Sequence, residues 1–99
     1  MKKIRAKKMP SWLGFMFAGK KSIGKTIYFD LKKEKIVSLH MVFVFFPINV
    51  YLLNGRKEVV EIKNNLKPFH FYSFSKKAQY VIESPRELNL KIGDRVRFI

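Results

Sequence analysis

The sequence predicts a small, mostly β domain with one short helix near its C-terminal end. Runs of β-branched and aromatic residues are typical of strands. The dipeptide Asn54-Gly55 is a strong hairpin signal, because a type I′ turn needs positive φ at both central residues. Ser84-Pro85-Arg86-Glu87 has the form of a helix start, with serine at N-cap, proline at N1 and glutamate at N3. Ninety-nine residues are enough for one domain and one core.

The first half of the chain predicts two strands joined by a turn. Residues 26–31 (TIYFDL) read as a strand, and the charged residues 32–35 (KKEK) read as a hairpin turn. Residues 36–46 are almost continuously apolar, so periodicity alone does not separate a buried strand from a buried helix. Their Val and Phe content favours a strand, and Pro47 should lie at a bulge, a bend or an edge because it has no N–H to donate.

The second half predicts a hairpin and two further strands. Residues 48–53 lead into Asn54-Gly55 and return as residues 57–63, where Val59 beside Val60 indicates a bulge or cover on both faces. Residues 64–75 are expected to cross as a loop. Strands are then expected at residues 79–83 and 95–98, on either side of the short helix. The positions expected in the core are Trp12, Phe15, Phe29, Met41, Phe43, Phe45, Val50, Leu52, Val60, Ile62, Tyr80, Ile82, Val96 and Phe98.

The N-terminal residues are strongly basic. We expect residues 1–9 to form a basic arm and residues 10–99 to form the single domain, which opens on an apolar knot at residues 11–17. Residues 12–18 are too short and too aromatic for the apolar part of a signal peptide. The longest apolar run, residues 36–53, is interrupted by polar residues and Pro47, which argues against a membrane span. With no cysteine in the chain, a reducing, cytoplasmic setting is expected.

Net charge is the most distinctive property of the composition. The chain has 21 Lys and Arg against seven Asp and Glu, a formal charge of +14. One interpretation is attraction to a polyanion, meaning nucleic acid or an anionic membrane surface. The other is a solubilising coat of lysines, which also suits a heat-adapted organism. Composition alone leaves both open.

Several stretches together resemble the domain of unknown function 192 family from about residue 10 onward. They are Gly14-Phe15-Met16-Phe17, residues 41–52 around Pro47, Asn65-Leu66-Lys67-Pro68-Phe69, residues 78–83 (AQYVIE) and residues 90–96 (LKIGDRV). The resemblance implies a compact, largely antiparallel, barrel-like β domain with a short helix and no established activity. Three departures from the family pattern are Ala18 in place of arginine, Val42-Phe43-Val44 in place of a polar stretch, and Asn49 in place of aspartate.

No catalytic centre, metal site or cofactor is expected, and we predict that the protein is not an enzyme. His40 and His70 have no partner at metal-ligand spacing, and the seven carboxylates are expected to be solvated at the surface. Residues 19–26 satisfy the spacing of a phosphate-binding loop. They are followed by a predicted strand, however, whereas a true loop of this kind leads into a long helix.

Cations interleaved with aromatic rings form the one candidate binding site. Bases stack on such rings while lysines follow the phosphates of a single strand of RNA or DNA. The alternative is that the rings close one end of the domain and the lysines only solubilise it. The accessory or binding role therefore stays unspecified, with nucleic acid or another polyanion as the candidate partner. The residues of this candidate site are Lys2, Lys3, Arg5, Lys7, Lys8, Lys67, Phe69, Phe71, Tyr72, Lys76 and Lys77.

Overall fold

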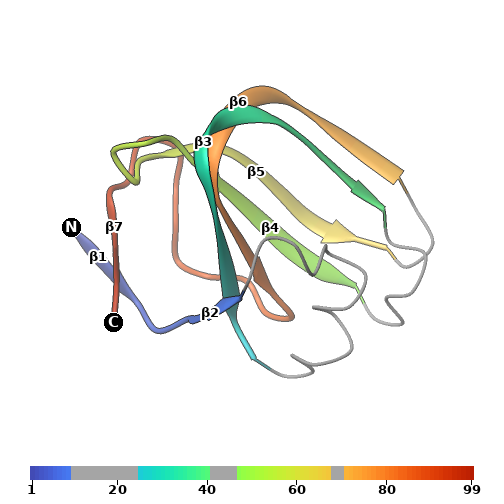
Figure 1. Ribbon diagram of the computed structural model, residues 1–99. Coiled ribbons are helices and arrows are strands. Elements are labelled where there is room, and N and C mark those ends of the chain that lie inside the picture. The colour runs from blue at the N-terminus through green and yellow to red at the C-terminus, as the bar shows by residue number, and fades with distance from the viewer. Residues whose placement is uncertain (10–24, 41–46, 68–70) are drawn as a thin grey trace.

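The computed structural model describes residues 1–9, 25–40, 47–67 and 71–99, and this part of the chain consists of strands, turns and loops. The predicted mostly β class is confirmed (Figure 1). In chain order the strands are β1 (Lys2–Ile4), β2 (Lys7–Met9), β3 (Ile27–His40), β4 (Ile48–Leu53), β5 (Val59–Leu66), β6 (Phe71–Ser84) and β7 (Val96–Phe98).

The strands form two sheets of mixed direction. A five-stranded sheet has the order β2-β3-β6-β4-β5, in which β2 runs parallel to β3 and the other pairs are antiparallel. A two-stranded parallel sheet joins β1 to β7. The expected antiparallel arrangement therefore needs correction at both N-terminal strands. Among the described strands the larger sheet is open, since β2 and β5 are its two edges, and the expected barrel is not closed.

Two hydrophobic clusters pack on opposite faces of the larger sheet. Val50 and Leu52 of β4 belong to one cluster, together with Phe29 of β3. Tyr51 and Leu53 belong to the other, with Val96 of β7 and the half-buried Ile4 of β1 at its border. All six residues of β4 are buried because both of its faces are covered. This double cover explains why residues 48–53 read as a continuous apolar run with little alternation.

The predicted core is confirmed where the structure describes it. Phe29, Val50, Leu52, Ile82 and Val96 are buried. Val60, Ile62, Tyr80 and Phe98 are half-buried and pack against the two clusters. Trp12, Phe15, Met41, Phe43 and Phe45 lie outside the described residues, as do the apolar knot at residues 11–17 and the end of the predicted strand at residues 36–46.

The prediction of a hairpin turn at residues 32–35 is wrong. Strand β3 continues through this segment, and residues 31–34 form a bulge opposite Gln79, between the pairs Asp30–Tyr80 and Lys35–Ala78. Lys32 takes a positive φ of 72°, and its N–H donates to the Asp30 carboxylate at 2.8 Å. The bulge bends β3 and β6 together without reversing them, as Figure 1 shows at the top of the molecule.

The reversal predicted at Asn54-Gly55 is confirmed, but the turn type is not. The Lys57 N–H donates to the Asn54 carbonyl at 2.9 Å, so the central residues are Gly55 and Arg56. Neither of them has positive φ; Lys57 takes that conformation instead, at 62°. The Asn54 side chain accepts from the Arg56 N–H at 2.9 Å, which fixes the turn locally.

The bulge expected beside Val59 is present. The pairing moves from Leu53–Val59 to Leu52–Glu61, which leaves Val60 without an opposite residue.

Two expectations for the C-terminal half are also corrected. The loop expected over residues 64–75 is mostly strand, because β5 continues to Leu66 and β6 begins at Phe71. The helix expected from Ser84 is absent from the described residues: Ser84 is the last residue of β6, and the chain beyond it is extended or bent. The final strand is confirmed as β7.

Candidate anion-binding site

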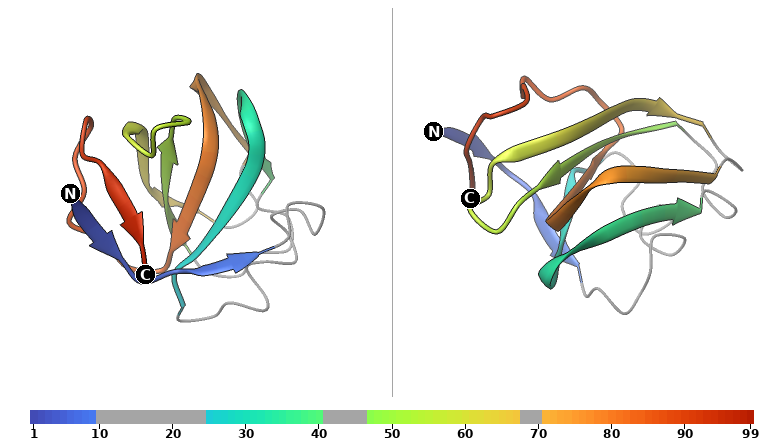
Figure 2. Two further views of the ribbon diagram at one scale, coloured as in Figure 1. Left: turned by 60° about the vertical axis from the view of Figure 1, so that its left-hand side comes forward. Right: turned by 90° about the horizontal axis from the view of Figure 1, so that it is seen from above.

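The N-terminal residues that read as a basic arm contribute two strands. The Lys2 N–H donates to the Arg95 carbonyl at 2.8 Å, and the Lys7 N–H donates to the Thr26 carbonyl at 3.0 Å. Since β1 pairs with β7 and β2 pairs with β3, the chain passes from one sheet to the other at Arg5 and Ala6 (Figure 2).

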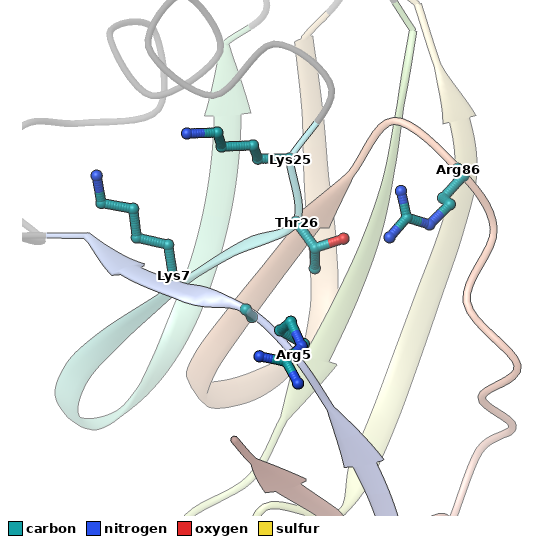
Figure 3. Close-up of a pocket in the computed structure, with 6 residues that line it drawn as sticks. Arg5, Lys7, Lys25, Thr26 and Arg86 are labelled. Atoms are coloured by element: carbon teal, nitrogen blue, oxygen red, sulfur yellow. The ribbon is translucent and has the colours of Figure 1, made fainter.

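A pocket of about 290 Å³ lies at this passage between the sheets. Its lining comes from three parts of the chain: the N-terminal strands, the start of β3 and the loop after β6. Figure 3 shows the Arg86 side chain reaching toward the hydroxyl side of Thr26, while Lys7 and Lys25 extend together on the other side. The lining residues are Arg5, Ala6, Lys7, Lys25, Thr26 and Arg86.

A buried hydrogen bond links the residue before β3 to the last residue of β6 beside the pocket. The hydroxyl groups of Thr26 and Ser84 lie 3.1 Å apart, and both residues are buried. Ser84 Oγ also accepts from the Arg86 N–H at 3.3 Å, which holds the loop that carries the Arg86 guanidinium. The segment that resembled a helix start, residues 84–87, therefore forms a turn, and this turn places the Arg86 side chain at the pocket.

The pocket is strongly positive. Four of its six lining residues are cations, and no carboxylate is among them. Like charges held around one pocket repel one another unless an anion lies between them. Arginine guanidinium groups suit phosphate or carboxylate because they donate two parallel hydrogen bonds, and lysine adds a point charge. The arrangement is therefore suited to holding an anion.

The carboxylates elsewhere are occupied with the backbone. Glu34 accepts from the Gly55 N–H at 2.8 Å, and Glu61 accepts from the Ser75 and Lys76 N–H groups at 3.0 and 2.9 Å. Asp94 accepts from the Lys91 N–H at 2.8 Å. Within the described ranges one ion pair is formed, between Lys2 and Asp94 at 3.9 Å. The expectation that all seven carboxylates are solvated at the surface is wrong for Glu83, which is buried. The cations that line the pocket form no ion pair within the described residues.

A buried polar group lies at the same end of the sheet, where Glu83 pairs with Ile27 and Val50. Glu83 is 3% exposed, and its Oε2 has no hydrogen-bond partner in the part of the chain that the structure describes. Burial raises the pKa of the Glu83 carboxyl to about 8, because the charged form loses its hydration. The carboxyl is therefore mostly neutral at pH 7.

Asn49, at a position where the resemblance led us to expect aspartate, is part of this buried end. Its amide nitrogen donates to the Ser84 carbonyl at 3.4 Å, and its oxygen accepts from the Asn65 N–H at 2.9 Å. An aspartate could make only the second of these bonds when ionised. The other two departures from the family pattern lie outside the described residues.

Comparison with known proteins identifies the family. The family DUF192, described as uncharacterized ACR, matches residues 4–98, which include every residue of the pocket lining. The chain belongs to the DUF192 family. A UPF0127 protein of Pyrococcus furiosus is 34% identical over 93 residues, which cover 88% of this chain and 77% of the relative. A UPF0127 protein of Pyrococcus horikoshii is 31% identical over 90 residues, 87% of this chain and 76% of the relative. These relatives come from thermophilic archaea.

Solved structures support the fold. A protein of unknown function from Novosphingobium aromaticivorans matches with a TM-score of 0.74 at 17% identity, over 93% of this chain and 73% of that one. A putative transcription regulator from Sinorhizobium meliloti matches with a TM-score of 0.64 at 20% identity, over 71% of this chain. The match spans 59% of the length of the Sinorhizobium protein. At these identities the likeness shows the DUF192 fold alone.

The predicted nucleic-acid-binding residues of this DUF192 protein fall into two groups. Lys2, Lys3, Arg5, Lys7 and Lys8 lie on or between β1 and β2, and two of them line the pocket. The described residues of the other group lie just after β5 and along the first half of β6. Lys7 pairs with the first residue of β3 and Phe71 with its last, so the two groups are at opposite ends of that strand (Figure 1). The second group comprises Lys67, Phe69, Phe71, Tyr72, Lys76 and Lys77.

Rings in the second group are not open stacking platforms where the structure describes them. The Lys63 ammonium lies 5.1 Å from the centre of the Tyr72 ring, and Phe74 meets the same ring edge-on at 4.7 Å. Phe74 is buried. Phe69 and the Phe71 side chain lie outside the described residues.

Four pocket residues, Ala6, Lys25, Thr26 and Arg86, were missed by the sequence prediction. Lys25 and Thr26 close the stretch that has phosphate-loop spacing, and that spacing was the only signal that pointed to them. Nothing local in the sequence connects this stretch to Arg86.

Within the described ranges, the structure contains no group of three or more His, Asp or Glu residues placed to hold a metal ion. In the same ranges no helix is long and apolar enough to cross a membrane.

Proposed function

We propose that this DUF192 protein is a non-enzymatic binding module for a phosphate-bearing anion, held in the pocket between β2, the start of β3 and the loop after β6. The observation that carries the proposal is the lining of this pocket. Arg5, Lys7, Lys25 and Arg86 surround one cavity with Thr26 on its wall, and no carboxylate shares the lining.

Placement of the cations supports the proposal better than their number does. A solubilising coat spreads its charges to lower their repulsion, whereas the pocket gathers four of them from three distant segments. The pairing of β2 with β3 and of β3 with β6 brings these segments together, and the buried Thr26–Ser84 hydrogen bond joins two of them, so the gathering is built into the fold. A phosphate group would accept hydrogen bonds from Arg86 and Arg5 and remove the repulsion among all four cations.

The test is titration of the protein with sodium pyrophosphate in about 0.15 M salt, where charges further apart than roughly 8 Å are screened. We expect saturable binding at one site by isothermal titration calorimetry. Arg86→Gln removes one charged hydrogen bond, worth about 1.5–3 kcal/mol, so affinity should fall about 10- to 100-fold. Lys33→Gln is the charge-matched control, since Lys33 is exposed on the bulge of β3, away from the pocket.

Two results would count against the proposal. If the heat of titration with pyrophosphate does not saturate at 0.15 M salt, the cations act only as a diffuse coat. An equal loss of affinity in Arg86→Gln and Lys33→Gln would show that net charge, rather than the pocket, controls binding.

A further inference from the structure

We infer that the bound phosphate belongs to an extended single strand of nucleic acid that follows the chain from Lys3 to Lys7 and enters the pocket. This inference rests on the proposed anion site and names its partner. It follows from the spacing of the cations that lead to the pocket and from the residue beside the first of them.

Alternate residues of the N-terminal segment are exposed. Lys3, Arg5 and Lys7 are exposed, while the residues between them, Ile4 and Ala6, are half-buried. The three exposed cations follow one another along the segment that leads to the pocket, with Lys3 on β1, Arg5 between the strands and Lys7 on β2, and two residues of extended chain span about 6.6 Å. The last two of these cations line the pocket.

The step between these cations suits a nucleic-acid backbone. One nucleotide repeat contains as many backbone bonds as two amino-acid residues, so an extended strand of either polymer advances by a similar distance per repeat. Successive phosphates of an extended single strand can therefore meet Lys3, Arg5 and the pocket in turn. A row of cations along one segment of the protein matches one phosphate backbone, as in the grooves that track single strands.

A second observation lies beside Lys3. In the parallel β1–β7 pair, Lys3 is level with Arg97, and both side chains are exposed. Like charges placed opposite each other on neighbouring strands are destabilising. The carboxylate nearest to Arg97 in the sequence is that of Asp94, which lies 3.9 Å from the Lys2 ammonium and accepts from the Lys91 N–H. A phosphate between Lys3 and Arg97 would relieve this repulsion, whereas a small anion confined to the pocket would leave the two cations unused.

The experiment measures binding of a labelled ten-nucleotide oligodeoxythymidylate by fluorescence anisotropy at several salt concentrations. Each phosphate contact on a single strand contributes about −0.7 to the slope of log K against log salt. Contacts at Lys3 with Arg97, at Arg5 and in the pocket should give a slope of about −2.1. At 0.15 M salt the Kd should be below about 100 μM, because non-specific nucleic-acid binding at physiological salt lies in this range or tighter.

The double variant Lys3→Gln/Arg97→Gln separates the oligonucleotide from the small anion. We expect it to weaken oligonucleotide binding and make the slope shallower by about 0.7, with pyrophosphate affinity unchanged. Arg86→Gln should weaken both ligands. The charge-matched control Lys33→Gln/Lys35→Gln, on the bulge of β3 and at the pair that follows it, should leave the affinity for both ligands as in the parent.

Failure of the inference is distinguishable from failure of the proposed function. Pyrophosphate binding without oligonucleotide binding at 0.15 M salt would overturn the inference and leave the anion pocket intact. An unchanged slope in Lys3→Gln/Arg97→Gln would also overturn it. A duplex of the same length that binds as tightly as the single strand would show that the partner is not single-stranded.

Discussion

The Tyr51 hydroxyl is hydrogen-bonded to both backbone groups of Leu88. It accepts from the Leu88 N–H at 2.7 Å and donates to the Leu88 carbonyl at 3.3 Å. Burial raises the pKa of this hydroxyl, so it stays protonated and keeps its donor. The loop that carries Arg86 is therefore held at one end by Ser84 and at the other by Leu88.

Tyr51→Phe should destabilise the fold. The substitution keeps the buried ring but leaves the backbone groups of Leu88 without the hydroxyl, a loss of about 1–3 kcal/mol. The free energy of unfolding in urea measures this loss. Tyr72→Phe is the control, because the contacts of Tyr72 are made by its ring. Equal stability of Tyr51→Phe and the parent would show that the two hydrogen bonds are dispensable.

Stability should fall as pH rises through the range in which Glu83 titrates. Burial raises the pKa of Glu83 from 4.5 to about 8. Between these values the unfolded chain releases a proton that the folded chain keeps, so the folded state loses stability with rising pH. The loss should level off above about pH 8 at roughly 4–5 kcal/mol, the free energy that corresponds to this pKa difference.

Glu83→Gln removes this titration and keeps the shape of the neutral carboxyl. Urea unfolding between pH 5 and pH 9 should then show a flatter stability profile, with the variant more stable than the parent at the alkaline end. Glu87→Gln, at an exposed position, is the control and should keep the slope of the parent. A parent-like slope in Glu83→Gln would mean that another group causes the pH dependence.

The sequence predicted the strands that have a strong apolar pattern, and its errors fall where distant contacts decide the structure. Residues 48–53 are strand because both of their faces are buried, and their composition shows this. The charged residues 32–35 have the composition of a turn, but the same residue types also suit a bulge within a strand, and β3 stays paired with β6 on both sides of its bulge. The predicted helix cap at Ser84 does not form, because the Thr26 hydroxyl, just before β3, meets Ser84 and the Tyr51 hydroxyl of β4 holds Leu88.

The candidate site was harder to predict than the fold. Lys2–Ile4 and Lys7–Met9 are too short to show any periodicity, and the partner of β1 lies at the far end of the chain. The pocket is lined by segments far apart in sequence: Thr26 and Ser84, whose hydroxyl groups meet beside it, are separated by 58 residues. The sequence therefore identifies the basic N-terminal residues but not the residues that line the pocket with them, because charge shows what a segment attracts and not where it lies.

Lys32→Gly should be tolerated in the bulge of β3. Lys32 has a φ of 72°, a conformation that costs a residue with a side chain about 1–2 kcal/mol and costs glycine little. Greater freedom of glycine in the unfolded chain offsets part of this gain, so the variant should be within about 1 kcal/mol of the parent. Lys33→Gly is the matched control and should lose about 0.5–1 kcal/mol, since Lys33 does not have positive φ. The reverse order of stability would contradict the bulge geometry.

Asn49→Asp should destabilise this protein even though the resemblance led us to expect aspartate at that position. The introduced carboxylate can still accept from the Asn65 N–H, but when ionised it faces the Ser84 carbonyl with no proton to donate. Position 49 is 7% exposed, so the unpaired charge would be poorly hydrated. We expect a loss of about 1–3 kcal/mol at pH 7. Because burial disfavours the ionised form, the loss should shrink as pH falls toward 4 and the carboxylate takes up a proton.

Asn64→Asp makes the same chemical change at an exposed position of β5 and should alter stability by less than about 0.5 kcal/mol. Urea unfolding of both variants at pH 4 and pH 7 measures the difference, and a loss for Asn49→Asp that does not depend on pH would show that the charge is not its cause.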